Sequence, residues 1–477
     1  MRFRFAVIVL LCTLAPGLVR GEAPEHDPAV TDPRTLREFD SGSLGLNRML
    51  GAPPGNEALF ALPSIVQLRP AFEAEFARYL DRHRATLPLE SIGIGPPHDV
   101  LLFDQSRLYA ANTSFVLAGI VNRMDRAYLA PETCGEIRLI YRLMQTGESA
   151  PARLPMTLNL VLRARQSGDA LDCPEIARRW LTPDPPLSML TPDHIDRIET
   201  NLQIAHVPQS ASREFRTDYL QKVFRLDRPG GNFVESSLEN QIDRDRLLAD
   251  APLAQDFKAW LLDADHLAAF DAGTVVIPER FLATGSVAST PAGFARSGLQ
   301  PSFGLMQSDR ADDNAVFRDD DVVAALAKAA KRGLGLQNIR SPAGFARRLN
   351  DIGCGGCHQV RGIGGFHFPG VDALVPTMVA ASPHFTGDQP RRRDILAALR
   401  DGIAPDFSRG FSDRPQPHRS AKLAGHAVRD GWGATCYRME APDDASFAAW
   451  SCAEGLSCQP AGADTASRIG MCFVKPE

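Results

Sequence analysis

The stretch Leu154-Pro155-Met156-Thr157-Leu158-Asn159-Leu160-Val161-Leu162-Arg163-Ala164 carries an apolar residue at nearly every second position. Successive residues of a β-strand point to opposite faces of the sheet, so this period of two predicts a strand with one buried face. Residues 100–103, 114–121 and 137–143 are also predicted as strands. Two more are expected within residues 215–237, on either side of a turn at 228–231. These stretches predict a mainly antiparallel sheet.

Helical spacing of apolar residues surrounds this strand-rich region. It occurs in residues 70–85, 173–180, 244–270, 319–331 and 342–350. Asp319-Asp320-Asp321 at one helix start and Lys331-Arg332-Gly333 at its end complement the helix dipole, so these acids favour a helix start over a calcium site. The sequence therefore predicts an α+β fold.

The length and composition exclude several classes of protein. A chain of 477 residues is too long for a single hydrophobic core and predicts more than one domain. With 44% hydrophobic and 23% charged residues, it is neither collagen-like, nor a coiled coil, nor intrinsically disordered. The net charge of −5 gives no reason to expect a nucleic-acid partner, because nucleic-acid binders usually carry a basic excess.

Residues 1–23 have the layout of a secretory signal peptide. Met1-Arg2-Phe3-Arg4 is a positive n-region and residues 5–14 are an apolar run, with cleavage expected after Gly21 or Ala23. A retained membrane anchor is the alternative, but the run is shorter than the roughly 20 residues needed to span a bilayer. No later segment comes close, so we expect a periplasmic or secreted protein with no integral membrane segment after cleavage.

The cysteines divide by their context. Export makes disulfides chemically permissible, and Cys134 and Cys173 are a lone upstream pair whose bridge would tie a helix to the sheet. Another four lie near the C-terminus, where some forty residues are too few for a large core and two disulfides are expected. These four allow three connectivities, which the sequence does not separate. They are Cys436, Cys452, Cys458 and Cys472.

Of the nine cysteines, Cys12 lies in the apolar run of the expected signal peptide and would be removed with it, and the remaining two lie in Cys354-Gly355-Gly356-Cys357-His358. Two thiols at this spacing reach the two vinyl groups of one porphyrin, and the histidine that follows meets the iron from the same side. With Gly362, residues 364–365 and residues 369–370, the segment resembles the haem-attachment loop of c-type cytochromes. The resemblance covers about residues 341–412. It implies one covalent haem c held by Cys354 and Cys357, with His358 as the proximal iron ligand.

Three other interpretations of the two cysteines remain. A thioredoxin-like dithiol also uses Cys-x-x-Cys, but it follows the first strand of a βαβ unit, and here a helix precedes it. Structural zinc needs two further soft ligands, and the C-terminal cysteines are distant and lack the paired spacing. A plain disulfide between Cys354 and Cys357 is the third possibility.

The second axial ligand has three candidates in the sequence after the motif: His367, His384 and Met378. The family pattern favours methionine, which raises the reduction potential relative to two histidines. Met378 nevertheless comes early and has no neighbouring proline, and each candidate could equally be an ordinary packed side chain. An open sixth position would favour reactivity over electron transfer.

Two charged segments lie outside the motif. Arg391-Arg392-Arg393 follows Pro390 at an expected helix start, where it is interpreted as a solvated charge run, with pairing to haem propionates as the alternative. Residues 121–125 and 133–138 are similar to segments of exported bacterial proteins of unassigned function that also carry Cys-x-x-Cys-His. Their charges at strand ends suit a buried ion pair or a binding cleft, and the structural interpretation is preferred.

The sequence predicts a large α+β domain, a small α-helical cytochrome c-like module and a disulfide-rich tail. The expected boundaries are 1–23 for the signal peptide, 24–240 for the α+β domain, 241–340 for a mainly helical segment, 341–412 for the haem module and 425–477 for the tail. The leading hypothesis is periplasmic electron transfer with a redox partner protein or small-molecule substrate. The alternatives are a peroxidase- or oxidase-like haem enzyme and a surface binding protein without haem.

Overall fold

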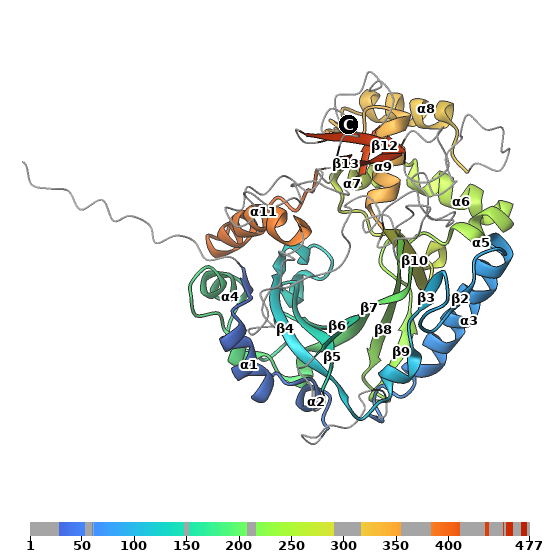
Figure 1. The fold of residues 1–477 in the computed structure, drawn as a ribbon. Helices are drawn as coiled ribbons and strands as arrows, with labels where there is room; N and C mark the ends of the chain where they lie inside the picture. The colour runs from blue at the N-terminus through green and yellow to red at the C-terminus, as the bar shows by residue number, and fades with distance from the viewer. Residues whose placement is uncertain are drawn as a thin grey trace, which may run out of the picture.

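The computed structural model describes residues 28–52, 60, 62–146, 152–207, 216–290, 316–353, 383–410, 435–437, 452, 455–460 and 469–474. Within these residues the chain forms a mixed α+β structure built on a ten-stranded sheet (Figure 1). All but one of the strand pairs in this sheet are antiparallel, the exception being β2 with β3. The predicted fold class is confirmed at this level.

The sheet follows the strand order β1-β4-β5-β6-β7, and β8 pairs with the other edge of β7. β3 pairs with β7 beyond the end of β6, and β9 and β10 both pair with β8. The strands are β1 Ala29–Val30, β2 Ile92–Gly93, β3 Val100–Leu102, β4 Thr113–Arg123, β5 Glu136–Gln145, β6 Ala152–Arg163, β7 Ile195–Val207, β8 Arg216–Asp227, β9 Asn232–Ser236 and β10 Gly285–Thr290. Every predicted strand is present, whereas the short strands β1 and β2 and the longer β7 and β10 were not predicted.

The helices of the first half of the chain lie on the outer side of the curved sheet (Figure 1). They are α1 Pro33–Ser41, α2 Leu46–Met49, α3 Leu68–Thr86 and α4 Cys173–Trp180. Phe72 and Phe76 of α3 belong to the first hydrophobic cluster, together with alternate residues of β5 and β6 such as Leu139 and Leu160. The period of two in β6 therefore has its predicted consequence, because one face of the strand is buried under helices.

A second hydrophobic cluster is built by the helices that follow the sheet. These are α5 Arg244–Ala249, α6 Ala251–Leu261, α7 Ala264–Ala272, α8 Asp319–Lys331 and α9 Pro342–Asp351. Phe257, Phe281, Phe317 and Phe345 pack together at its centre. The predicted helix starts are confirmed at α8, which begins on its three aspartates, and at α9, where Ser341 Oγ accepts a hydrogen bond from Gly344 N–H at 3.0 Å.

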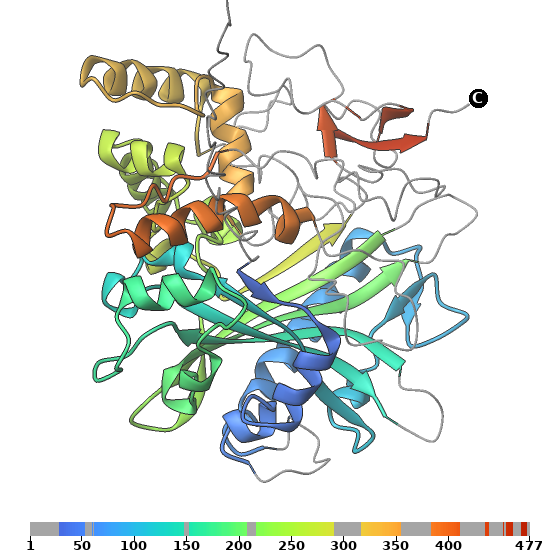
Figure 2. The same cartoon turned by 90° about the vertical axis from the view of Figure 1, so that its left-hand side faces the viewer.

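The last long helix, α11 (Pro383–Arg400), returns to the sheet. It lies alongside α4 at one end of the strands (Figure 1; Figure 2), and its Leu396 belongs to the first hydrophobic cluster. The segment expected as one haem module, 341–412, thus contributes α9 to the second cluster and α11 to the first.

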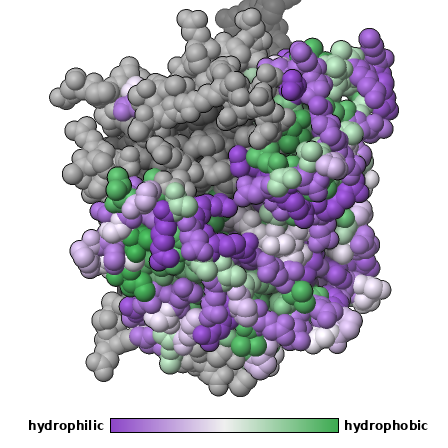
Figure 3. Space-filling model, turned by 90° about the vertical axis from the view of Figure 1, so that its right-hand side faces the viewer, coloured by the Kyte–Doolittle hydropathy of each residue, from purple (hydrophilic) through white to green (hydrophobic). Residues whose placement is uncertain are grey.

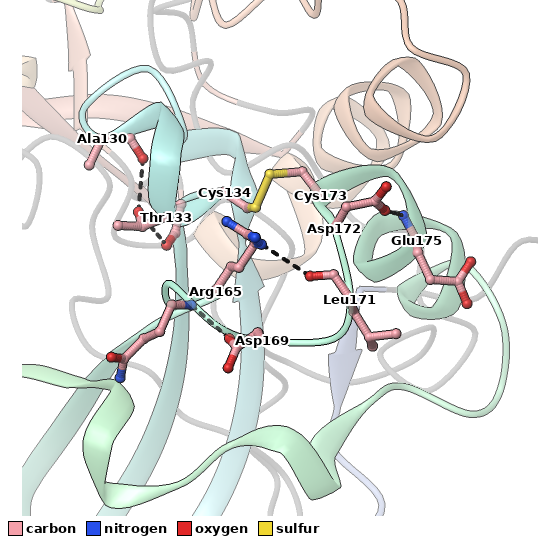
Figure 4. Close-up of a disulfide and its surroundings, with 11 residues drawn as sticks. Ala130, Thr133, Cys134, Arg165, Asp169, Leu171, Asp172, Cys173 and Glu175 are labelled. Atoms are coloured by element: carbon pink, nitrogen blue, oxygen red, sulfur yellow. Dashed lines mark hydrogen bonds between the residues drawn. A yellow bond between two sulfur atoms is a disulfide. The ribbon is translucent and has the colours of Figure 1, made fainter.

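The Cys134–Cys173 disulfide predicted from the sequence is present, with the two Cα atoms 5.5 Å apart. Figure 4 shows that it joins the turn before β5 to the first residue of α4. Asp172 caps α4 by accepting a hydrogen bond from Glu175 N–H at 2.9 Å. The bridge therefore fixes α4, the helix beside α11, to the sheet.

The described part of the tail is a small antiparallel sheet of β11 Thr435–Tyr437, β12 Leu456–Pro460 and β13 Ile469–Val474. Cys452 and Cys458 are disulfide-bonded. The backbone register places Cys458 directly opposite Cys472.

The surface opposite α11 is mostly hydrophilic. Figure 3 shows hydrophobic residues there only in small groups between hydrophilic ones. Single exposed hydrophobic side chains are normal on protein surfaces. No helix among the described residues is long and apolar enough to cross a membrane.

Candidate functional site

The Cys-x-x-Cys-His motif lies in the chain between two described elements, α9 and α11. Cys354, Cys357, His358, His367 and Met378 fall outside the described residues. The backbone of His384 lies in the first turn of α11, but its side chain also falls outside the described part. The neighbourhood of the motif is therefore known from its two flanks, which end at Gly353 and begin again at Pro383.

The first flank is held in place up to the residue before Cys354. α9 buries Phe345 and Leu349 in the second hydrophobic cluster, which anchors the helix. Gly353 is buried, and a Cβ atom there would lie 3.0 Å from the carbonyl oxygen of Asn240. The atom that such a Cβ would approach belongs to the backbone of Asn240, which cannot move aside as a flexible side chain could. Glycine at 353 therefore allows the two backbone segments to lie this close. The start of the motif is thereby fixed beside residues 240–241.

Residues 239–241 connect this flank to buried charges at the sheet. The Asn240 side chain donates to the Val275 carbonyl and accepts from Ile277 N–H, both at 2.9 Å, which holds the segment. The preceding Glu239 forms an ion pair with Arg126, in the short 3₁₀ helix Met124–Arg126 after β4. Only one residue separates Glu239 from Gln241, so the ion pair lies next to the approach to Cys354.

Arg348 provides a second connection from α9. Its guanidinium is buried and donates to the carbonyl oxygens of Asp271 at 2.7 Å and Arg409 at 2.9 Å. The Asp271 carboxylate in turn accepts three backbone N–H groups of residues 337–339. These contacts fix α9, the end of α7 and the chain after α11 relative to one another.

At the second flank, α11 carries a cluster of buried charges against the end of β4. Arg391 pairs with Asp125 at 2.7 Å and with Asp388 at 2.9 Å. Arg392 pairs with Asp388 at 2.9 Å, and Arg123 pairs with Asp125 at 2.8 Å. We call these five residues the arginine cluster. The cluster brings together the charged segments 121–125 and 391–393, which are far apart in the sequence.

The interpretation of Arg391-Arg392-Arg393 as a solvated run at a helix start is wrong. α11 begins at Pro383, so Pro390 lies inside the helix and the arginines occupy its middle. Arg392 is only 6% exposed, because this face of α11 packs on the 3₁₀ helix Met124–Arg126 and α4. The preference for a buried ion pair at 121–125 is confirmed by the Arg123–Asp125 contact.

The electrostatics of the arginine cluster favour anions. Burial alone would raise the pKa of Asp125, but Arg123, Arg392 and Arg391 hold it well below its usual value. Burial, with the positive charge of Arg123, lowers the pKa of Arg392 to about 10. Three guanidinium groups face two carboxylates in the cluster, so its positive charge exceeds its negative charge.

Two polar groups of the cluster region lack hydrogen-bond partners within the described part of the chain. Nη1 of Arg392 is buried and unpaired, although Nε of the same side chain contacts Asp388. Gln389, one turn earlier on α11, is 3% exposed, and both its Nε2 and its Oε1 are unpaired. Buried polar groups are nearly always satisfied, so these donors suit a ligand such as a carboxylate.

A second charge network continues from Arg126 along the polar face of the sheet. Glu136 contacts Arg126 at 3.1 Å, Arg138 at 3.1 Å and Arg197 at 2.8 Å. Glu199 contacts Arg138 at 3.0 Å and Arg197 at 2.7 Å. With the Glu239–Arg126 pair, three arginines face three glutamates. Arg197 also contacts Asp196 at 3.1 Å, and Asp196 pairs in turn with Arg163 and Arg225. Each of the three arginines Arg126, Arg138 and Arg197 thus contacts at least two carboxylates.

Further along the same face, a row of neutral polar residues crosses the sheet. The register places Thr157, Asn201, Gln221 and Ser286 opposite one another on β6, β7, β8 and β10. Asn201 Oδ1, both amide atoms of Gln221 and Ser286 Oγ are buried without a hydrogen-bond partner among the described residues. The row can accept and donate hydrogen bonds but carries no nucleophile–base pair.

Within the described residues, no group of three or more His, Cys, Asp or Glu side chains could hold a metal ion. Asp319, Asp320 and Asp321 form the first turn of α8, as the sequence predicts for a helix start.

In comparisons with known proteins, no family model matches the chain, and no curated protein and no solved structure matches it.

Sequence reasoning missed two members of the candidate site. Asp388 and Gln389 were not singled out, because neither belongs to a motif and their burial depends on the packing of α11. Asp125 and Arg391 were both noted, but they are 266 residues apart, and no local pattern predicts their contact. The available signal was the presence of charge at the end of a predicted strand and on a later helix.

Proposed function

We propose that the protein is an exported c-type haem protein that acts in periplasmic electron transfer. The observation that carries the proposal is the sequence Cys354-Gly355-Gly356-Cys357-His358. Cys354 and Cys357 would form the thioether bonds, and His358 would be the proximal iron ligand. When bound, haem supplies one-electron chemistry at the iron. His367, His384 and Met378 are the candidate second axial ligands.

Three features of the chain support this proposal. The residue before Cys354 is held by α9 and Asn240, which would give an attached haem a defined position. The arginine cluster has donors and positive charge that fit the carboxylates of a haem. The Cys134–Cys173 disulfide fits an oxidising compartment such as the periplasm.

The large sheet domain would supply the docking surface for a redox partner protein, or the surface for a small-molecule substrate. The finer architecture belongs to the same proposal, with a small haem module at 341–412 and a disulfide-rich tail at 425–477. The tail is expected to have a structural or recognition role, because nothing in its sequence is catalytic.

A denaturing gel stained for haem tests the proposal directly, because only thioether-linked porphyrin survives denaturation. The full chain would be expressed in a host with cytochrome maturation machinery. We expect wild type to stain and Cys354→Ala/Cys357→Ala to be colourless, while the matched control Cys134→Ala/Cys173→Ala keeps its haem. Colourless wild-type protein from this host would overturn the proposal in favour of a binding protein without haem.

The second ligand is tested by spectra of His367→Ala, His384→Ala and Met378→Ala. Removal of the true ligand is expected to convert a low-spin ferric spectrum to a high-spin one, and the other two substitutions should leave it unchanged. A high-spin wild-type spectrum together with peroxide turnover would instead support the haem-enzyme alternative.

A further inference from the structure

We propose that Arg392, with Arg123, Arg391 and Gln389, forms a buried binding site for a carboxylate, and that in the haem-loaded protein this carboxylate is a haem propionate. The existence of the anion site is argued from the described residues alone. The identity of its ligand rests on the proposed function.

Arg392 has a buried guanidinium nitrogen without a hydrogen-bond partner among the described residues. Arg392 is 6% exposed and uses Nε for Asp388 at 2.9 Å, while its Nη1 has no hydrogen-bond partner in the described part of the chain. Guanidinium groups bind carboxylates through paired N–H donors, and an unpaired buried donor is unfavourable. The side chain therefore keeps one donating atom ready for an acceptor.

The side-chain amide of Gln389, on the same helix, is also buried without a hydrogen-bond partner among the described residues. Gln389 precedes Arg392 by three positions, which places both side chains on one face of α11. Its amide is buried with neither atom paired among the described residues. Gln389 Nε2 can donate to the same carboxylate group as Arg392. Two unsatisfied side chains on one helix face are better explained by one shared ligand than by two separate defects.

The arginine cluster contains more positive than negative side chains. Arg123, Arg391 and Arg392 face only Asp125 and Asp388, which leaves one positive charge in excess within the cluster. Arg409 adds positive charge that acts on Arg392 and Asp388. A bound carboxylate would balance the cluster. In the neighbouring network, by contrast, Arg126, Arg138 and Arg197 each contact at least two carboxylates.

Contacts of the residues that precede Cys354 lead to the arginine cluster by two routes. From α9, Arg348 holds the carbonyl of Arg409, and the charge of Arg409 acts on Arg392. From Gly353, the contact with Asn240 leads to Glu239 and its partner Arg126, whose charge acts on Arg123. Both routes from the residues before Cys354 therefore end at the arginine cluster.

The proposal is tested with the full-length protein and three α11 variants: Arg392→Met, Arg392→Lys and the matched control Arg400→Met. Arg400 lies on the same helix and pairs with Asp401 nearer the surface at 2.7 Å. We expect all three to retain covalent haem on a stained gel. Arg392→Met should lower the midpoint potential, because loss of a nearby positive charge favours ferric iron. Arg392→Lys should restore much of the potential, and Arg400→Met should match wild type.

The pH dependence of the potential separates an electrostatic role from a merely structural one. Arg392 would keep the propionate ionised to low pH in wild type. In Arg392→Met the propionate should protonate at higher pH, so the onset of the pH dependence of the potential should move upward. If haem is attached and the potential of Arg392→Met follows that of wild type at every pH, the propionate assignment is wrong while the proposed function stands.

A binding measurement distinguishes the source of the carboxylate. Succinate would be added to Cys354→Ala/Cys357→Ala, and the unfolding temperature recorded. We expect stabilisation that is lost when Arg392→Met is added, and no stabilisation of the haem-loaded protein, whose site would be filled. Equal stabilisation of both forms would show that the ligand is a free carboxylate. No stabilisation of the haem-free form, or stabilisation that survives Arg392→Met, would overturn the anion site.

Discussion

Glu199 shows how a single buried carboxylate couples the fold to pH. Burial would raise its pKa, but Arg138 and Arg197 lower it to about 2 from an ordinary value of 4.5. A carboxylate whose pKa is depressed on folding stabilises the protein above the unfolded-state pKa, and this contribution disappears as pH falls through the folded-state value. The stabilisation should therefore be complete above about pH 5 and lost between there and pH 2.

We predict that Glu199→Gln lowers the free energy of unfolding by about 3 kcal/mol at pH 7, because it leaves two buried arginines with less negative charge. The difference from wild type should shrink as pH falls toward 2, and urea denaturation at several pH values measures it. The control is Glu73→Gln, which removes an exposed pair with Arg69 at 2.7 Å and should have no measurable effect. A pH-independent loss at Glu199 would show that packing, rather than charge, is responsible.

Gln221 allows the opposite test at the residue scale. Both its amide atoms are unpaired among the described residues, and it is 5% exposed. Replacing an unsatisfied buried amide by an apolar group of similar size removes a desolvation penalty, so Gln221→Met should leave the free energy of unfolding unchanged or raise it by about 1 kcal/mol. Thermal and urea denaturation test this. A loss of more than about 2 kcal/mol would mean that the amide is satisfied in solution.

Residues were predictable where chemistry or spacing is local. Cys134 and Cys173 could be paired because they are the two cysteines left after the signal peptide, the motif and the tail are set aside. The ion pairing of Arg391 and the burial of Arg392 could not be predicted, because they depend on Asp125 and on where α11 begins. A proline usually marks the first turn of a helix, and this preference misplaced the start by seven residues.

At the scale of elements, strands in which apolar and polar residues alternate regularly were predicted. The long strand β7, in which the alternation is irregular, was not. β6 keeps its period of two over the pairing with β7, and it was predicted. β7 (Ile195–Val207) was not, although it lies in the middle of the sheet. Its register with β6 shifts near its start, so that Ile195 and Ile198 both join the buried cluster at a spacing of three. A bulge of this kind breaks the sequence pattern without breaking the strand.

The disulfide between the β5 turn and α4 should contribute to the stability of the elements that it joins. It closes a loop with a sequence separation of 39. Loop-closure entropy for that length predicts that Cys134→Ser/Cys173→Ser loses about 4 kcal/mol, and strain or residual structure would reduce the loss. Denaturant unfolding without reductant measures it. Each single substitution should match the double variant, since either one opens the loop. A double variant as stable as wild type would contradict the prediction.

The tail has one connectivity that its register favours. Cys458 lies opposite Cys472 across β12 and β13, and both Cys452 and Cys458 are disulfide-bonded. We predict that non-reducing peptide mapping finds Cys458 joined to Cys472 and Cys436 joined to Cys452. A peptide containing a Cys436–Cys458 or Cys452–Cys458 bridge would exclude this arrangement.

At the scale of the whole molecule, the described residues form two hydrophobic clusters, and the Cys-x-x-Cys-His motif lies in the chain between elements of each. Periodicity predicted most strands and helices, because each pattern reports the burial of one element. It did not predict that α9 packs in the second cluster while α11 packs with the sheet, because this choice depends on contacts between distant residues such as Arg348 and Arg409.

This division predicts how the molecule behaves without haem. Both clusters, as described, consist of residues outside 354–382, so neither needs a thioether-linked porphyrin to be buried. We expect Cys354→Ala/Cys357→Ala to keep the far-ultraviolet circular dichroism of wild type and to unfold cooperatively. Hydrogen exchange should show unchanged protection in β5, β6 and β7, and reduced protection near the C-terminal turn of α9 and in α11, which flank the motif. The matched control Cys134→Ala/Cys173→Ala should show the reverse, with exchange rising around α4 while the flanks stay protected. Loss of protection throughout the sheet in the haem-free variant would mean that the two clusters depend on the cofactor, and that the large domain is not an independent support for it.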